Sequence, residues 1–271
     1  MRKTYVQSKV TTLKEGCAVV EIKHFEVLRD GMTIRGMMTK PEGEGPFPAV
    51  IFNHGFTGHK GESHFIFKKL ADVLADKGIV SFRFDFIGNG ESDGQLIDMT
   101  MTSEVKDCLA IFDYAVNFEY VDANFMNLLG FSMGGAVSIL AASILHEQVK
   151  KLILLSPAAN MQDVLSRKLY GEALLHYIET GAIDLGGNVV GKSLLEDVFG
   201  LNIYEAAKQV TAEVQLIHGT HDDAVPPLVS WRLAEIFAEK GSLHWIHGSD
   251  HCYTSARYET EVIDVVKNFF G

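Results

Sequence analysis

The residues best suited to chemistry are a serine between two glycines, residues 130–134 (GFSMG), directly after the apolar run 126–129. A G-x-S-x-G pattern between a strand and a helix is typical of a nucleophile elbow, a sharp turn that lifts one serine into a cleft. Such a turn is strained and crowded, so glycine is expected on both flanks. The pattern predicts that Ser132 is a covalent nucleophile, provided that partner residues exist elsewhere in the chain.

An acid and a histidine follow two later apolar runs. Residues 214–217 lead into Asp222, and residues 243–246 lead into His251. A serine hydroxyl becomes a nucleophile when a base takes its proton, and that base must be held in one tautomer by a third group. The order serine, aspartate, histidine therefore predicts a triad with His251 as base and Asp222 as its partner.

Two neighbouring residues compete for these roles. Asp223 is adjacent to Asp222, but Asp222 is favoured because it lies three residues after Gly219. His247 stands at the end of its predicted strand, where its side chain can face the core, so His251 is favoured as the base.

The negative oxygen that forms during acyl transfer needs two preplaced N–H donors. One is expected to be the backbone N–H of Met133, at the start of the helix after the elbow. The other is expected to be the backbone N–H of Phe56, just after His54 and Gly55. His54 could itself be a base, but because it stands beside a glycine it is expected to shape this loop. We place it among the substrate-binding residues.

A metal site is the main alternative for the region around Asp222. His218 and His221 lie close to Asp222 and Asp223 in the sequence. Their spacing matches no zinc template well, and no further strong ligand cluster is near. We therefore predict no metal, and we expect no cofactor.

Two other patterns have simpler interpretations. Residues 88–90 (GNG) could indicate phosphate binding, but the full G-x-G-x-x-G pattern is absent because position 93 is an aspartate. A loop at the edge of the sheet is the preferred interpretation. Cys252 could be mistaken for a nucleophile, but no elbow surrounds it, so a small packed side chain is expected.

Strand-like and helix-like patterns alternate along most of the chain. Such alternation predicts an α/β fold, with a mostly parallel sheet covered by helices on both faces. A hairpin is expected from residues 18–28 and 32–38 around the turn at 29–31. The further expected strands are 49–52, 79–86, 126–131, 152–155, 214–217 and 243–246, and the expected helices are 62–77, 104–118, the segment after Ser132, and 256–270.

Residues 158–208 interrupt this rhythm, because about fifty residues stand where one helix would suffice. They contain helix-like pieces at 164–178 and 194–199 and a turn at 185–189. Long insertions between core strands are usually functional. We expect a cap between the sixth and seventh core strands, with residues 1–157 and 209–271 forming the core.

The composition of the 271 residues sets further bounds. The formal net charge is −11, and no basic patch is visible, which argues against nucleic acid as a partner. Cys17, Cys108 and Cys252 are too few and scattered for a disulfide framework and are expected to be reduced thiols. Residues 1–10 lack the apolar core of a signal peptide, and no run approaches a membrane span. We expect a soluble cytoplasmic protein with a small-molecule ester substrate and no membrane partner, and a homodimer is allowed.

Taken together, these segments carry a resemblance to a known superfamily over nearly the whole chain. The chain resembles a serine esterase of the α/β-hydrolase superfamily, and within it the bacterial cinnamoyl (feruloyl) esterases. The superfamily motifs are 54–56, 85–92, 130–134, 219–226 and 248–251, and the phrases similar to cinnamoyl esterases are 82–86 (FRFDF), 154–159 (LLSPAA) and 202–205 (NIYE).

This resemblance implies an ester of ferulic, p-coumaric or caffeic acid as substrate. It also implies that Asp163, at the start of the cap, contacts the phenolic hydroxyl. The chain departs from its relatives after residues 185–187, where Asn188 and Val189 stand in place of an aromatic residue. A general carboxylesterase or acylglycerol lipase, a serine peptidase of the same superfamily and a binding protein without catalysis remain as alternatives.

Overall fold

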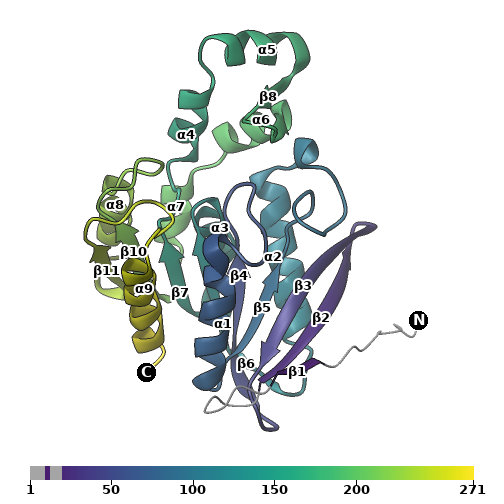
Figure 1. The fold of residues 1–271 in the computed structure, drawn as a ribbon, viewed down its shortest axis with the longest axis vertical. Coiled ribbons are helices and arrows are strands. Elements are labelled where there is room, and N and C mark those ends of the chain that lie inside the picture. Colours follow the sequence, from purple (N-terminus) through teal and green to yellow (C-terminus); the bar gives the residue numbers. More distant parts are fainter. Residues whose placement is uncertain (1–9, 13–19) are drawn as a thin grey trace.

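The structure is a computed structural model that describes residues 10–12 and 20–271. Its main sheet has nine strands in the order β1-β2-β3-β5-β4-β6-β7-β10-β11 (Figure 1). The strands from β5 to β11 run parallel, and β1, β2 and β3 join antiparallel at one edge. The strands are β1 Val10–Thr12, β2 Val20–Arg29, β3 Met32–Lys40, β4 Phe47–Asn53, β5 Val80–Phe84, β6 Val121–Phe131, β7 Val149–Leu155, β10 Glu213–Gly219 and β11 Gly241–Ile246.

The first hairpin forms at the predicted turn. Arg29 pairs with Met32, and the turn residues Asp30 and Gly31 have φ angles of 51° and 84°. Glycine adopts such angles without steric cost, which explains its place in the turn. Residues 18 and 19 of the predicted first strand lie outside the described residues.

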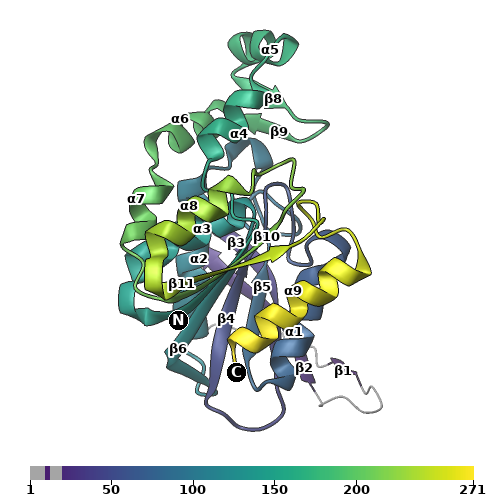
Figure 2. The same ribbon diagram turned by 90° about the vertical axis from the view of Figure 1, so that its left-hand side faces the viewer.

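Helices cover both faces of the sheet, as predicted (Figure 2). On β4, Val50 and Phe52 pack with α1 and α9 on one face, while Ala49 and Ile51 pack with α2 and α3 on the other. Both faces of the central strands are therefore buried, which is why these strands are continuously apolar. The helices of this core are α1 Ile66–Asp76, α2 Met101–Ala115, α3 Met133–Leu145, α7 Ile203–Lys208, α8 Leu228–Phe237 and α9 Ala256–Phe269, and short 3-10 turns span Ser63–Phe65, Leu96–Asp98, His146–Gln148 and Ala238–Lys240.

The helix predicted for residues 62–77 begins later, at Ile66. Glu62, His64 and Phe65 have φ angles of 57°, 41° and 60°, which no α-helix contains. The Glu62 carboxylate accepts hydrogen bonds from the backbone N–H groups of Gly55 and Ser63. Side-chain bonds to the backbone compete with helical ones, so the chain turns here before the helix begins.

Residues 158–208 lie mostly outside the sheet, between β7 and β10, and rise above its carboxyl edge (Figure 1). The helix expected at 164–178 is two helices, broken before Gly171, whose φ is 58°. The turn expected at 185–189 joins the small hairpin of β8 and β9. The last helix of the range, α7, packs against α3 and α8 and so lies with the core. The elements outside the sheet are α4 Met161–Lys168, α5 Glu172–Thr180, β8 Ala182–Asp184, β9 Val189–Gly191 and α6 Lys192–Gly200.

In the part of the chain that the structure describes, no helix has both the length and the apolar character needed to span a membrane.

Candidate active site

Ser132 lies in a sharp turn between β6 and α3, as the G-x-S-x-G pattern predicts. Its φ is 53° and its ψ is −119°, a conformation that costs a non-glycine residue about 1–3 kcal/mol. The surrounding structure holds it there, because the Ser132 N–H donates to the carbonyl of Leu155 at 2.9 Å and its carbonyl accepts from the Ala158 N–H at 2.9 Å. The serine is thereby presented at the carboxyl edge of the sheet.

Both glycines of the pattern are required by close backbone contacts. A Cβ atom on Gly130 would lie 2.2 Å from the carbonyl oxygen of Gly134. A Cβ atom on Gly134 would lie 2.1 Å from the carbonyl oxygen of Asn53. No side chain fits at such distances, so the helix after Ser132 can approach the end of β4 only because these residues are glycine.

The structure brings the three predicted triad residues together from three strand ends. The His251 Nε2 atom lies 2.9 Å from the Ser132 Oγ atom, and the His251 Nδ1 atom lies 2.6 Å from the Asp222 Oδ2 atom. A carboxylate only accepts hydrogen bonds, so the proton of a neutral His251 sits on Nδ1. The lone pair of Nε2 then faces the serine hydroxyl, as proton abstraction requires.

Asp222 is buried, with 5% of its surface exposed. Its Oδ1 atom accepts from the backbone N–H groups of Ala224 at 2.9 Å and Val225 at 2.8 Å. Burial alone would raise the pKa of this carboxyl, but hydrogen bonds from His218 and His251 hold the pKa well below its usual range. Asp222 is therefore ionised at neutral pH.

Asp223 and His247, the alternatives for the acid and the base, are not part of this hydrogen-bonded series. Asp223 is exposed to solvent. His247 is also exposed, which corrects the expectation that its side chain faces the core, because β11 already ends at Ile246. His221 is exposed as well, so it does not converge with the buried His218. Within residues 10–12 and 20–271, no three or more histidine, cysteine or acidic side chains form a group that could hold a metal.

The two residues predicted to bind an oxyanion are Phe56, which precedes Ser132 in the chain, and Met133, which follows it directly. Met133 is the first residue of α3, and Phe56 follows β4 in a loop that lines the cavity beside Ser132. Within the described part of the chain, neither backbone N–H has a hydrogen-bond partner. Both donors are thus available to a ligand, and their role in binding an oxyanion stays a prediction.

His54 is fully buried and does not line the cavity. Its Nε2 atom accepts from the Phe86 N–H at 3.0 Å, so its Nδ1 atom carries the proton and donates to the Gly55 carbonyl at 2.8 Å. Burial lowers the pKa of His54 to about 4, which keeps the ring neutral at pH 7. These contacts fit the predicted role in shaping the loop, and they give no support to a direct substrate contact.

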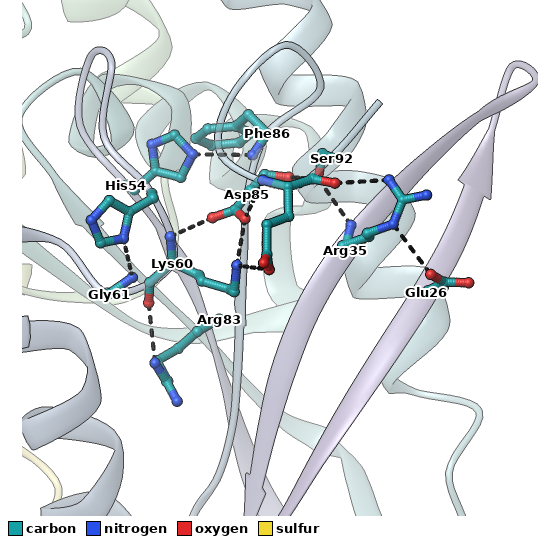
Figure 3. A network of polar contacts seen from close by, with 11 residues as sticks. Glu26, Arg35, His54, Lys60, Gly61, Arg83, Asp85, Phe86 and Ser92 are labelled. Carbon is teal, nitrogen blue, oxygen red and sulfur yellow. Dashed lines mark hydrogen bonds and ion pairs between the residues drawn. The ribbon is translucent and has the colours of Figure 1, made fainter. Parts of the chain in front are cut away.

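A polar network extends this anchoring along the loop (Figure 3). The buried Asp85 carboxylate accepts from the Lys60 backbone N–H at 2.6 Å, from Lys60 Nζ at 2.6 Å and from the Glu91 N–H at 3.0 Å. The Lys60 carbonyl in turn accepts from Arg83 at 3.2 Å. The loop after β4, which carries Phe56, and the loop after β5 are therefore tied together.

Gly88 and Gly90 both allow close packing in the loop after β5. A Cβ atom on Gly90 would lie 2.4 Å from the Asp85 carboxylate, and one on Gly88 would lie 2.8 Å from the carbonyl of Gln95. Both residues also have positive φ angles, of 90° for Gly88 and 52° for Gly90. Gly90 thus lets the backbone pack against Asp85, and Gly88 lets it pack against Gln95.

A cavity of about 650 Å³ opens over Ser132 and His251. Its wall on the side of the insertion is apolar. On α4, the helical period turns Met161, Val164 and Leu165 toward this cavity and leaves Asp163 exposed and outside its lining. The structure therefore gives no support to a substrate contact at Asp163. The apolar side chains of the lining are Phe56, Phe65, Phe131, Ala158, Met161, Val164, Leu165, Leu185, Ala224 and Val225.

Glu62 is a cavity residue that the sequence did not reveal. Its buried carboxyl lines the cavity and accepts from the Gly55 N–H at 2.5 Å, and burial raises its pKa. The sequence predicted Glu62 as the first residue of a helix, and only its short distance along the chain from the His54-Gly55 pair could have signalled another role.

The described cysteines are free thiols. Cys108 is buried, and Cys252 is half-buried at the cavity wall, where burial raises the pKa of its thiol. A raised pKa makes a cysteine a poorer nucleophile at neutral pH. Cys17 lies outside the described residues.

Solved structures share this fold. Est1E from Butyrivibrio proteoclasticus, solved with ferulic acid bound, superposes with a TM-score of 0.80 at 26% identity, over 90% of this chain and 97% of that one. Mouse alpha/beta hydrolase domain-containing protein 10 superposes with a TM-score of 0.70 at 22% identity, over 91% and 97% of the two chains, and shows the fold alone. The protein thus has the α/β-hydrolase fold that the sequence predicts.

Proteins with similar sequences include two monoglyceride lipases. Monoglyceride lipase of Mus musculus is 30% identical over 152 residues, which cover 55% of this chain and 48% of the lipase. The human monoglyceride lipase is 26% identical over 211 residues, or 73% and 67% of the two chains. The chain spans about half or less of the curated relatives it matches first. Residues 44–183, more than half of the 271 residues, match the hydrolase family described as serine aminopeptidase, S33, and the chain belongs to this family.

Proposed function

We propose that this protein is a serine carboxylic ester hydrolase that works through an acyl-serine intermediate. The observation that carries the proposal is the hydrogen-bonded series from Asp222 through His251 to Ser132, which ends in an apolar cavity. These are the three groups, in the required contacts, that activate a serine hydroxyl for acyl transfer.

The chemistry follows from the arrangement. His251 Nε2 takes the Ser132 proton as Oγ bonds to the ester carbonyl carbon. Asp222 stabilises the imidazolium, which then donates the proton to the departing alkoxide as the C–O bond breaks. A water molecule then attacks the acyl-serine, with His251 as base again, and the free acid leaves.

The oxyanion formed in both steps would be bound by the backbone N–H groups of Phe56 and Met133. Each such donor typically lowers the barrier by about 3 kcal/mol. The network of His54, Lys60 and Asp85 supports this role, because it restrains the loop that carries Phe56 before substrate binds.

For the substrate, we propose a hydroxycinnamoyl ester of the feruloyl type. The apolar wall formed by Met161, Val164, Leu165 and Leu185 suits an aromatic acyl group. The similarity to Est1E, whose structure holds ferulic acid, supports the same choice. The phenolic contact at Asp163 stays a prediction from resemblance.

A second candidate is hydrolysis of acylglycerols. The relatives named monoglyceride lipase favour it, and the same apolar wall could accept an alkyl chain. Because the family is described as serine aminopeptidase, aminopeptidase activity is a further candidate.

Two experiments test the proposal. A fluorophosphonate probe should label Ser132, and failure to label it would leave only a binding role. A panel of methyl ferulate, p-nitrophenyl butyrate, a monoacylglycerol and an aminoacyl anilide would then rank the substrates. We expect methyl ferulate to have the highest kcat/KM, and a rate no better than that of the butyrate ester would defeat the feruloyl assignment.

A further inference from the structure

A second histidine lies directly behind the predicted acid. His218, near the end of β10, is 0% exposed. Its Nε2 atom lies 3.0 Å from the Asp222 Oδ2 atom and 3.0 Å from the carbonyl oxygen of Val225. Its Nδ1 atom lies 2.6 Å from the hydroxyl of Ser230, which is also fully buried, on α8.

These partners determine the tautomer of His218. The Asp222 carboxylate and the Val225 carbonyl only accept hydrogen bonds, so Nε2 must carry a proton that both share. The neutral ring then accepts from the Ser230 hydroxyl at Nδ1. A continuous series of hydrogen bonds thus runs from Ser230 through His218, Asp222 and His251 to Ser132.

We propose that His218 is a positioning residue of this site, which fixes the Asp222 carboxylate and draws part of its negative charge away from His251. The inference rests on the proposed function, because it concerns the efficiency of the same triad.

The first effect is on orientation. Oδ1 of Asp222 accepts two backbone N–H groups, and Oδ2 accepts His251 Nδ1 and His218 Nε2. Four donors occupy the carboxylate, so it cannot rotate without losing a buried hydrogen bond. Without His218, Oδ2 keeps only the bond to the residue that it must orient.

The second effect is on the base. The His218 N–H draws part of the negative charge of the Asp222 carboxylate toward itself. The carboxylate then stabilises the His251 imidazolium less strongly. Removing His218 should therefore raise the pH at which His251 becomes protonated. A protonated His251 cannot act as the base. A purely structural residue would lower activity or stability without moving this transition.

The other titratable groups near His251 stay constant in the test. Glu62 faces it from the loop before α1, and Asp250 and Cys252 are its neighbours in its own loop. Because the variants change none of these groups, a shift can be assigned to the contact between His218 and Asp222.

The experiment uses the full chain and measures the rate of Ser132 labelling by a fluorophosphonate between pH 5 and 9. His218→Asn and His218→Gln form a matched pair, because the Gln amide nitrogen reaches the place of Nε2 and the Asn amide nitrogen only that of Nδ1. We expect His218→Asn to move the midpoint of the acid limb up by about 0.5–1 pH unit. We also expect labelling at pH 8 to fall by about 10-fold to 100-fold. His218→Gln should keep both the midpoint and the labelling rate at pH 8 close to those of the parent protein.

Gln215→Leu is the control for loss of a buried polar side chain on the same strand. It should leave the midpoint within about 0.2 pH unit of that of the parent protein. Circular dichroism checks that each variant is folded, and if His218→Asn is not, the midpoint of His218→Leu takes its place.

The outcomes separate the inference from the proposed function. If the parent protein is not labelled, the proposed function fails. If it is labelled and the midpoint of His218→Asn equals that of the parent, or if His218→Gln shifts as far as His218→Asn, the inference alone is overturned.

Discussion

The carboxyl edge of the sheet and the insertion face each other across one cavity, but they are stabilised differently. At the edge, Asp222 and His218 are buried and hydrogen-bonded. In the insertion, α5 exposes apolar side chains, with 62% of Leu175 and 69% of Ile178 accessible to solvent. A rigid edge can keep reacting groups aligned, while a loosely supported insertion can change its lining without disturbing them. We therefore expect substitutions at the edge to affect the chemistry and those in the insertion to affect substrate preference.

The largest expected effect is the loss of the nucleophile. Ser132→Ala should lower kcat by about 10⁶-fold, because no other group can form the acyl intermediate. The melting temperature should stay close to that of the parent, since the substitution removes one hydroxyl from a cavity wall. Measured turnover of p-nitrophenyl butyrate by the folded variant at more than a few per cent of the parent rate would contradict the assignment of Ser132.

The adjacent aspartates provide a sharper comparison within the edge. Asp222→Asn should lower kcat by about 10⁴-fold, because an amide no longer stabilises the imidazolium or selects its tautomer. Asp223→Asn is the matched control and should change kcat less than twofold, since Asp223 is exposed. Steady-state kinetics of both variants measure the difference, and equal losses would refute the choice of Asp222.

Two glycines test whether the edge is more tightly packed than the insertion. Gly134→Ala places a Cβ atom 2.1 Å from the Asn53 carbonyl and should cost about 3 kcal/mol of the free energy of unfolding. Gly186→Ala meets no atom within 4 Å and should cost about 1 kcal/mol, from its φ of 75° alone. Urea denaturation checks both values, and similar costs would show that the two regions do not differ in this way.

The smallest expected effect concerns the insertion. Val164→Ala enlarges the cavity and should lower kcat/KM for methyl ferulate by about tenfold. Its effect on p-nitrophenyl acetate, whose acyl group is much smaller than a feruloyl group, should be less than twofold. Asp163→Asn lies outside the cavity lining on the same helix and should change neither rate. A larger loss for Asp163→Asn than for Val164→Ala would restore the phenolic contact that the resemblance implies.

Sequence patterns predicted the elements whose signals are local. The hairpin at Asp30-Gly31 and the elbow at Ser132 formed where they were expected, because turn residues and glycine contacts act over a few positions. The start of α1 was predicted incorrectly because the bonds of Glu62 to Gly55 and Ser63 belong to a folded loop. The helix α8 was not predicted from its sequence at all.

The sequence by itself determined the type of fold and the candidate nucleophile, because periodicity and the spacing of Gly130, Ser132 and Gly134 are properties of a short stretch of chain. Only the tertiary structure showed that Asp222 and not Asp223 contacts His251, that Asp163 lies outside the cavity lining and that His218 contacts Asp222. These outcomes depend on which side chains from distant strands and helices meet in a buried space, and a linear pattern does not contain those distances.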